Sequence, residues 1–432
     1  MNRIILLGNG FDLAHDLRTS YKHFIDNFWA NASKKYFNKN SFTFSNDYIS
    51  IEIPPLKRHD ELIKPKESDI FDYKTFSNFL HQNGRLEIKF KNHFLEIITK
   101  NLSFKDWVDI EEEYYQQIKN IVQNELQPYK KKEIMRKLNE EFEKIKEELE
   151  KYLSEITSKN IAEIDKMFHI FYAGFELEDF PKSKENLLLE YIAAIIYKCD
   201  DMYKYRELRE EAIEHIIRNY KIDDSEIKIK HIIEYIKLKL DNLFSNNRDK
   251  FYPQNTLILN FNYTNTESLY SKYGDVKRDF PKLPFHSIHI HGELNNKENP
   301  IIFGYGDELA DEYKEIEKLG DPEYFRNIKS IKYLKTGNYR KLLNFIDSDY
   351  YQVFTLGHSC GNSDRTLLNT LFEHENCVSI KPFFYEKEEN GEKTDDYENI
   401  TINMSRNFND KKAFREKVVN RTRCTSLPQI QK

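Results

Sequence analysis

The sequence predicts an α/β protein in which a large all-helical insertion interrupts a mostly parallel sheet. Three observations support this prediction. A short aliphatic run at residues 3–7 breaks directly into a Gly-x-Gly turn at residues 8–10. Between about residues 13 and 245, apolar residues recur at three- and four-residue spacing, which is typical of amphipathic helices. From residue 255 onward short apolar runs return, several of them continuous, as in strands covered on both faces.

The first strand, at residues 3–7, is expected to join the C-terminal strands in one sheet. Those strands are predicted at Thr256–Asn260, Ser287–His291, Ile301–Phe303, Gln352–Leu356, Val378–Ile380 and Ile400–Asn403. A helix is predicted at Arg365–Phe372. Residues 1–30 and 250–432 are therefore expected to form a discontinuous nucleotide-binding domain, with residues 31–249 as the helical insertion.

Residues 131–157 show the helical spacing most clearly. One apolar stripe runs among lysines and glutamates, formed by Ile134, Leu138, Phe142, Ile145, Leu149, Leu153 and Ile156. This pattern predicts a long amphipathic helix that packs on its own domain or, alternatively, pairs between subunits of a homo-oligomer. A second helical stretch is expected at about 185–245, whereas residues 40–75, with three prolines, are expected to be irregular.

Composition restricts the class of protein. The 432 residues are 39% hydrophobic and carry a formal charge of −6, which fits a packed core and disfavours a surface that coats nucleic acid. We find no apolar stretch long enough to span a membrane and no signal-peptide pattern, so a cytoplasmic protein without membrane contact is expected. No CxxC pair occurs, and Cys199, Cys360, Cys377 and Cys424 are expected to be ordinary thiols without a zinc site.

The loop after the first strand is the first candidate for ligand binding. Gly8 and Gly10 permit a tight turn and close approach to a phosphate, and the following helix would offer exposed N–H groups to an anion. Phe11 belongs to the same predicted binding loop. Asn9 or Asp12 could bond a ribose hydroxyl, although Asp12 could instead cap the helix.

Two further polar segments follow predicted strands. Asn260 and Asn262 could orient a ribose or a water molecule, unless they only form an Asx-turn that closes the strand. His289 and His291 alternate, so both rings could face one metal ion. We favour His291, followed by Gly292, as a general base, and a core histidine without a role stays the alternative.

A fourth polar segment follows the strand at Gln352–Leu356. Gly357, His358 and Ser359 suit contact with a phosphate or ribose at the carboxyl end of that strand. Asp364 could contribute to the same site or could serve as the N-cap of the next helix.

Together these motifs resemble the AbiH family, which is associated with bacterial abortive infection against phage. The resemblance covers nearly the whole chain and rests on GNGFDLAHDLRTSY at 8–21, WVDIEE at 107–112, LNFNYTNT at 259–266, HIHGEL at 289–294, IIFGYGDE at 301–308 and LGHSCGNSD at 356–364. It implies an anti-phage effector, for which a phage-derived trigger is a possible partner.

The order of the motifs is also similar, more distantly, to the sirtuin-like NAD-binding domain with its Rossmann-like sheet. This resemblance implies pyrophosphate contacts for Gly8 and Gly10, ribose contact for Asn262, a base role for His291, and adenosine-side contacts for Gly357 and Ser359. Thr264 departs from the acid often found at its position, and Asn9 and Asp12 replace smaller residues of the glycine loop. The missing CxxC pairs disfavour a zinc-dependent deacylase.

The resulting functional hypothesis is hydrolysis of NAD at the nicotinamide–ribose bond, with NAD as substrate and no other cofactor required. Cleavage of this bond builds oxocarbenium character on the sugar. His291 would accept a proton, Asn262 would orient the ribose, and Asp12 would stabilise the positive charge.

Other interpretations stay open at this point. One is a metal-dependent nuclease or phosphohydrolase that uses His289, His291 and Asp307. Another is a non-catalytic sensor that binds NAD, ADP-ribose or a phage component. A dehydrogenase is disfavoured because Leu13 stands where the third glycine of G-x-G-x-x-G is needed.

The WVDIEE segment could add groups from the helical insertion. Asp109 could cap a helix and Glu111 could reach the cleft, whereas the alternative is a packing Trp107 with surface carboxylates.

Overall fold

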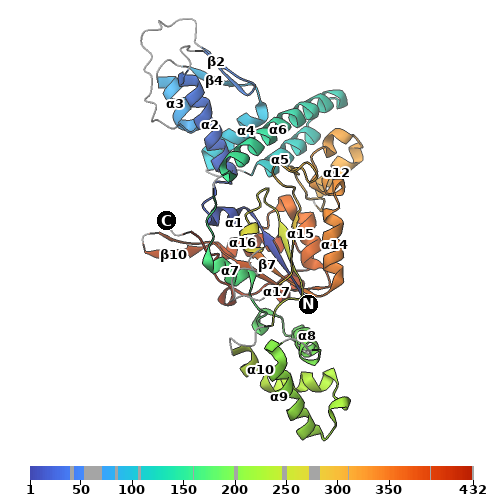
Figure 1. Cartoon of the computed structure of the whole chain (residues 1–432). Coiled ribbons are helices and arrows are strands. Elements are labelled where there is room, and N and C mark those ends of the chain that lie inside the picture. Colours follow the sequence, from blue (N-terminus) through green and yellow to red (C-terminus); the bar gives the residue numbers. More distant parts are fainter. Residues whose placement is uncertain are drawn as a thin grey trace.

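The computed structural model describes residues 1–38, 43–52, 71–82, 86–105, 109–158, 160–198, 203–245, 251–271, 283–309, 311–389 and 391–430. A parallel sheet lies in the middle of an elongated molecule (Figure 1). Helices α2 to α6 lie at one end of the molecule, and helices α8 to α10 lie at the other end. We refer to residues 21–158 as the α2–α6 unit and to residues 185–245 as the α8–α10 unit.

The central sheet has five parallel strands in the order β6-β5-β1-β7-β8. Their bounds are β1 Asn2–Leu7, β5 Thr256–Asn260, β6 Phe285–His289, β7 Tyr351–Leu356 and β8 Cys377–Phe383. The predicted parallel α/β sheet is confirmed, and so is the pairing of the first strand with C-terminal strands. Counted along the chain, the order is 3-2-1-4-5, so the direction of winding reverses between β1 and β7.

Strand β1 lies at the centre of the sheet and is buried along its whole length. Its side chains alternate between two cores, because successive residues of a strand face opposite sides. Ile4 and Leu6 pack in the core on one face, and Ile5 and Leu7 pack in the core on the other. This double coverage explains why the aliphatic run is continuous.

Short helices cover and connect the strands. They are α1 Asn9–Ala14, α7 Asp165–Phe171, α11 Ser268–Ser271, α12 Asp311–Leu319, α13 Lys329–Lys332, α14 Asn338–Ser348, α15 Arg365–Glu373, α16 Tyr397–Arg406 and α17 Lys411–Lys417. The helix expected at Arg365–Phe372 is thereby confirmed. A small hairpin, β9 Glu386–Glu389 with β10 Glu392–Asp395, projects beyond β8.

Two predicted strands are wrong. The segment Ile301–Phe303 has no regular secondary structure. Ile301 and Phe303 pack in the core of the α2–α6 unit, whereas Ile302 packs against the sheet. Because its residues are buried on alternate sides, its sequence has the apolar pattern of a strand. Residues 400–403 lie inside α16, where Ile400 and Met404 are buried four residues apart on one helical face. The strand expected to reach His291 ends at His289.

The α2–α6 unit contains strands, so the prediction of an all-helical insertion is wrong. Its elements are α2 Tyr21–Asn38, β2 Phe44–Ser45, β3 Ile49–Glu52, α3 Tyr73–Gln82, β4 Glu87–Phe90, α4 His93–Lys105, α5 Ile110–Gln123 and α6 Pro128–Thr157. The three strands form an antiparallel sheet in the order β2-β3-β4. Part of the segment expected to be irregular, residues 40–75, is therefore regular, and residues 40–42 and 53–70 of it lie outside the described residues.

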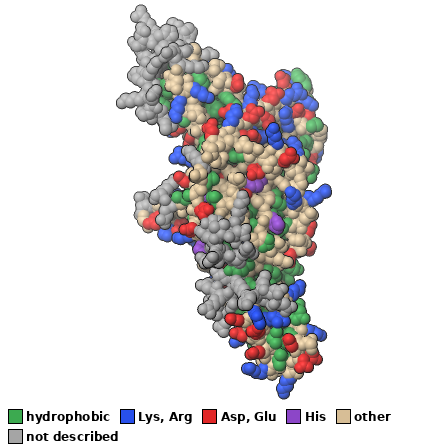
Figure 2. Space-filling model, viewed as in Figure 1, with side chains coloured by type: hydrophobic (Ala, Val, Ile, Leu, Met, Phe, Trp, Pro, Cys, Tyr) green, Lys and Arg blue, Asp and Glu red, His purple; other side chains and the backbone are tan. Residues whose placement is uncertain are grey.

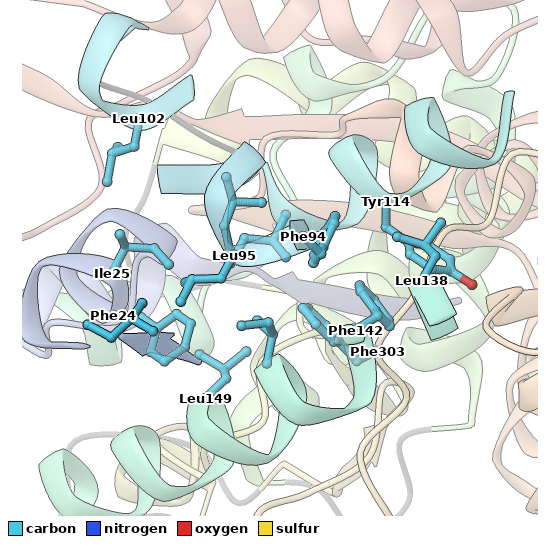
Figure 3. Packing of buried hydrophobic residues seen from close by; sticks show 14 of the residues in the cluster. Phe24, Ile25, Phe94, Leu95, Leu102, Tyr114, Leu138, Phe142, Leu149 and Phe303 are labelled. Atoms are coloured by element: carbon cyan, nitrogen blue, oxygen red, sulfur yellow. The ribbon is translucent and has the colours of Figure 1, made fainter. Parts of the chain in front are cut away.

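The long amphipathic helix is confirmed as α6. Its apolar stripe packs within this chain: Leu138, Phe142, Ile145 and Leu149 are all buried in the core of the α2–α6 unit. Figure 3 shows Phe142 lying against Phe303, and their rings stack with centroids 4.6 Å apart. Packing on its own chain, the first of the two interpretations, therefore accounts for most of the stripe.

The α8–α10 unit consists of α8 Glu185–Tyr197, α9 Tyr203–Tyr220 and α10 Ile229–Ser245. It packs against the sheet through Met1 and Val378, which belong to its core. On the face shown in Figure 2, acidic and basic side chains are interspersed over this unit. None of the helices in the described ranges combines the length and apolarity needed to cross a membrane.

Three of the four cysteines can be placed. Cys360, Cys377 and Cys424 are buried free thiols, as expected, and burial raises the pKa of each. Cys199 lies outside the described residues.

Candidate active site at the carboxyl ends of the parallel strands

The loops that follow β1, β5, β6 and β7 converge on a cavity of about 460 Å³. Of the predicted site residues, those that line it are Gly8, Asn9, Gly10, Asp12, Asn262, His291, Gly357, His358, Ser359 and Asp364. The sheet therefore brings together polar loops that are some 250 residues apart in the chain. The cavity lies where the winding of the sheet reverses, which is the usual ligand position in open α/β sheets.

Three predicted site residues do not line this cavity. Phe11 is fully buried in the sheet core and contacts the rings of Phe171 and Tyr270. Asn260 forms the Asx-turn that was the alternative interpretation, because its Oδ1 accepts from the Asn262 N–H at 2.9 Å. Gly292 has φ +83°, and a Cβ there would lie 2.2 Å from a backbone oxygen, so a backbone requirement explains this glycine.

The glycines of the first loop pack against the loop after β7. A Cβ on Gly10 would lie 2.7 Å from the Gly357 Cα, and one on Gly8 would lie 2.5 Å from the His358 Cα. The N–H of Gly10 donates to the Gly357 oxygen at 2.7 Å, and that of Phe11 to the Gly8 oxygen at 2.9 Å. The expectation that the N–H groups at the start of this helix are exposed to receive an anion therefore does not hold for Gly10 and Phe11. Loop packing requires the glycines.

Asp12 is a buried carboxylate in the cavity lining. It does not cap α1, because Gly8 occupies the N-cap and Asp12 lies inside the helix. Its Oδ2 accepts from the Thr264 hydroxyl at 2.7 Å, whereas its buried Oδ1 has no hydrogen-bond partner in the described part of the chain. Burial raises the pKa of Asp12 to about 7. Thr264, which follows β5, thus pairs with an acid in α1.

Asn262 and Asn9 hold the cavity walls in place. The Asn262 Nδ2 donates to the Gly8 oxygen at 3.0 Å, which ties the loop after β5 to the loop after β1. The Asn9 Oδ1 accepts from the Thr19 hydroxyl at 2.5 Å. Both amides therefore have structural contacts, and their ligand roles stay predictions.

His291 forms the centre of a buried cluster. Its Nε2 lies 3.2 Å from the Asp364 Oδ1 and 3.0 Å from the Tyr333 hydroxyl. Burial and the nearby Lys329 ammonium lower the pKa of His291 to about 4, so the imidazole is neutral near pH 7. A neutral imidazole can accept a proton, which a general base requires.

Asp364 stands at the N-cap position of α15, but its side chain makes no capping hydrogen bond. Its Oδ1 instead accepts from the Lys329 ammonium at 2.8 Å. Burial alone would raise the pKa of Asp364, but Lys329 and His291 outweigh it and hold that pKa well below its usual value. The ionised carboxylate can only accept hydrogen bonds, so we assign the His291 proton to Nε2 and leave Nδ1 as the basic nitrogen.

Glu111 reaches the cavity from the α2–α6 unit. Asp109 caps α5 and accepts from the N–H groups of Glu111 and Glu112 at 3.0 and 3.1 Å, as one interpretation expected. The Glu111 Oε2 lies 2.9 Å from the Lys329 Nζ, and its Oε1 accepts from the Gly304 N–H. Burial raises the pKa of Glu111 to about 7. Glu111 is therefore no surface carboxylate, while Trp107 lies outside the described residues.

The two histidines of the His-x-His pattern have different partners. His289 pairs with Glu267 at 2.8 Å, on a separate loop from Asp364. Asp307, the acid of the metal-dependent alternative, lies 3.4 Å from the Arg365 guanidinium. Within the described ranges, no three His, Cys, Asp or Glu side chains are grouped to hold a metal ion.

His358 and Ser359 lie between two cavities. His358 is 3.6 Å from the Asp364 Oδ2, and its ring packs edge-on against Phe261. A second cavity of about 1180 Å³ shares Gly10, Gly357, His358 and Ser359 with the first. The loops after β1 and β7 thus contribute residues to the lining of both spaces.

Sequence reasoning missed Lys329 and Tyr333. Lys329 lies in the run Lys329-Ser330-Ile331-Lys332, which looks like a solvated face, and no local pattern marks its burial. The signal that could have found it is the excess of acids over bases among the cavity residues, which calls for a buried cation.

Comparison with known proteins gives a match to a family. The model of the family described as bacteriophage abortive infection AbiH matches residues 4–386, a range that includes every loop of the cavity. No curated protein and no solved structure shows a significant match to the chain. Because the match extends over most of its length, the chain belongs to the bacteriophage abortive infection family AbiH, and this membership implies a role in abortive infection.

Proposed function

We propose that the chain acts in abortive infection by hydrolysing NAD at the bond between nicotinamide and ribose. The observation that carries this proposal is that Asp12, whose buried Oδ1 has no hydrogen-bond partner in the described residues, lines the same cavity as the neutral His291. A buried carboxylate oxygen without a partner favours a cationic ligand. The nicotinamide ring of NAD and the sugar in the transition state both carry positive charge.

The chemistry assigns one task to each group. Water adds to the anomeric carbon as the bond to nicotinamide breaks, and the proton of that water passes to the basic nitrogen of His291. The ionised Asp12 stabilises the positive charge on the sugar, and nicotinamide leaves as a neutral molecule. Such general-base assistance contributes about 10²–10⁴-fold to the rate.

The two adjoining cavities support a dinucleotide rather than a mononucleotide. The smaller cavity, of about 460 Å³, has the volume of a typical small-molecule site. The larger one extends past Gly357 and Ser359 and would hold the adenosine half. Because the Gly10 N–H is already bonded to the protein, the Ser359 hydroxyl is the candidate we favour for pyrophosphate contact.

The test is incubation of the purified full chain with NAD, with nicotinamide release as the readout, in the presence and absence of a divalent-metal chelator. We expect His291→Ala and Asn262→Ala to lose most of the release. The matched control is His374→Ala, whose ring contacts Asp347 outside the cavity and should retain activity. Equal turnover by His291→Ala and the unmodified chain contradicts the proposal. Binding of NAD without turnover indicates a sensor, and loss with the chelator indicates metal-dependent chemistry.

A further inference from the structure

Lys329 joins three separate parts of the fold. Its side chain is fully buried, with Nζ 2.9 Å from the Glu111 Oε2 and 2.8 Å from the Asp364 Oδ1. Glu111 comes from α5 of the α2–α6 unit, Lys329 from α13, and Asp364 from the segment between β7 and α15. A buried ammonium is tolerated only with such compensation, so the three side chains depend on one another.

The cluster continues to His291, because the same Asp364 Oδ1 that accepts from Lys329 lies 3.2 Å from the His291 Nε2. A positive charge at this position has two effects. It keeps Asp364 ionised, so that the carboxylate can orient the imidazole. It also opposes the addition of a second proton to His291.

We propose that Lys329 is a positioning residue that ties Glu111 of the α2–α6 unit to Asp364 and thereby keeps His291 oriented and neutral. The site is then complete only when the α2–α6 unit is docked on the sheet. Stacking of Tyr115 on Tyr305, with ring centroids 3.9 Å apart, fixes α5 against the segment that precedes α12, and the Tyr305 oxygen accepts from the Lys329 N–H at 2.8 Å.

Several titratable groups face this cluster from the surrounding elements. They are Asp109 and Glu111 of α5, Asp364 and His358 after β7, Tyr21 of α2, Tyr263 after β5, and Tyr333 after α13. Burial raises the pKa of each of these tyrosines, so they stay neutral near pH 7. Lys329 is thus the cation that balances Glu111 and Asp364. Its removal leaves carboxylate charge uncompensated beside His291 and should favour the imidazolium.

The experiment measures the pKa of His291 by NMR in the full chain with labelled histidine, and a His291→Gln variant identifies the signal. We expect Lys329→Met to raise the pKa of His291 by about 1–3 pH units. Lys332→Met is the matched control. Lys332 is a buried lysine on the same short helix whose Nζ contacts Asn327, and its removal should leave His291 unchanged.

A variant that fails to fold does not end the test. In the double variant Lys329→Met with Glu111→Gln, one of the two uncompensated carboxylates is removed, while Asp364 still faces His291 without the ammonium. An upward shift is still expected there. An unchanged pKa of His291 in the folded single or double variant overturns the proposal, and so does an equal shift in Lys332→Met.

The inference rests on the proposed function for its catalytic meaning, but the titration needs no substrate. If the unmodified chain hydrolyses NAD, the acidic limb of its pH–rate profile should move to higher pH in Lys329→Met by the same amount as the pKa. Absence of NAD hydrolysis contradicts the proposed function alone. Hydrolysis with an unmoved acidic limb contradicts the role of Lys329 alone.

Discussion

Replacement of Gly357 by alanine tests the contact between the loops after β1 and β7. Gly357 has φ +67°, and a Cβ there would lie 2.2 Å from the Phe11 backbone nitrogen. The left-handed backbone costs an alanine about 1–2 kcal/mol. Overpacking against backbone adds about 1–3 kcal/mol, because the contacted atoms cannot rotate away. Gly357→Ala should therefore lower the free energy of unfolding by about 2–5 kcal/mol.

Two other glycines separate these contributions. Gly320 has φ +63° with no atom within 4 Å of an added Cβ, so Gly320→Ala should lose only the backbone part. Gly10 lies inside α1 and would contact Gly357, so Gly10→Ala should lose only the packing part.

The assay combines urea-induced unfolding with hydrogen exchange of peptides from β1 and β7. We expect Gly357→Ala to be the most destabilised of the three variants and to exchange faster in both strands. If Gly357→Ala is no less stable than Gly320→Ala, the loops do not pack as described.

Two further predictions concern the α2–α6 unit and Asp12. Leu149 is buried in the core, so Leu149→Ala should lower the free energy of unfolding by about 2–5 kcal/mol. Ile134 lies at the exposed start of the α6 stripe, so Ile134→Ala should change it by less than about 0.5 kcal/mol in the same urea titration. Equal losses of stability in the two variants would mean that the α6 stripe does not pack in the core of the α2–α6 unit. The pKa of Asp12 is about 7 in the folded chain and about 3.8 for an aspartate in the unfolded chain. The folded chain therefore holds this proton to higher pH, and Asp12 costs stability as pH rises from about 4 to 7. Asp12→Asn should therefore raise the free energy of unfolding by at most about 4 kcal/mol at about pH 8, and by almost nothing below about pH 4. A gain in stability that is largest at low pH would contradict this reasoning.

Local periodicity predicted the elements whose burial is regular. The aliphatic run of β1 is continuous because the sheet is covered on both faces, and the α6 stripe has helical spacing because one face is buried. The same rule misled at Ile301–Phe303, which is buried on two sides without pairing in a sheet. It also missed the helix at Tyr397–Arg406, where tertiary packing outweighs the strand propensity of a β-branched run.

The candidate site could be predicted only in part. Strand ends of a parallel sheet meet at one edge, so sequence order alone indicated that Asp12, Asn262 and His291 would lie near one cavity. Sequence order could not indicate that the Gly357 oxygen would accept a hydrogen bond from the Gly10 N–H, because that bond depends on the distance between two loops far apart in the chain.

The sequence by itself determined the elements whose burial follows a regular local pattern, such as β1 and α6, since that pattern depends on neighbours within a few positions. Tertiary structure alone decided the charge state of the site. Lys329 has no distinguishing neighbours along the chain, yet folding buries it between Glu111 and Asp364. Electrostatic interactions act through space and grow as water is excluded, so only the folded arrangement lowers the pKa values of His291 and Asp364.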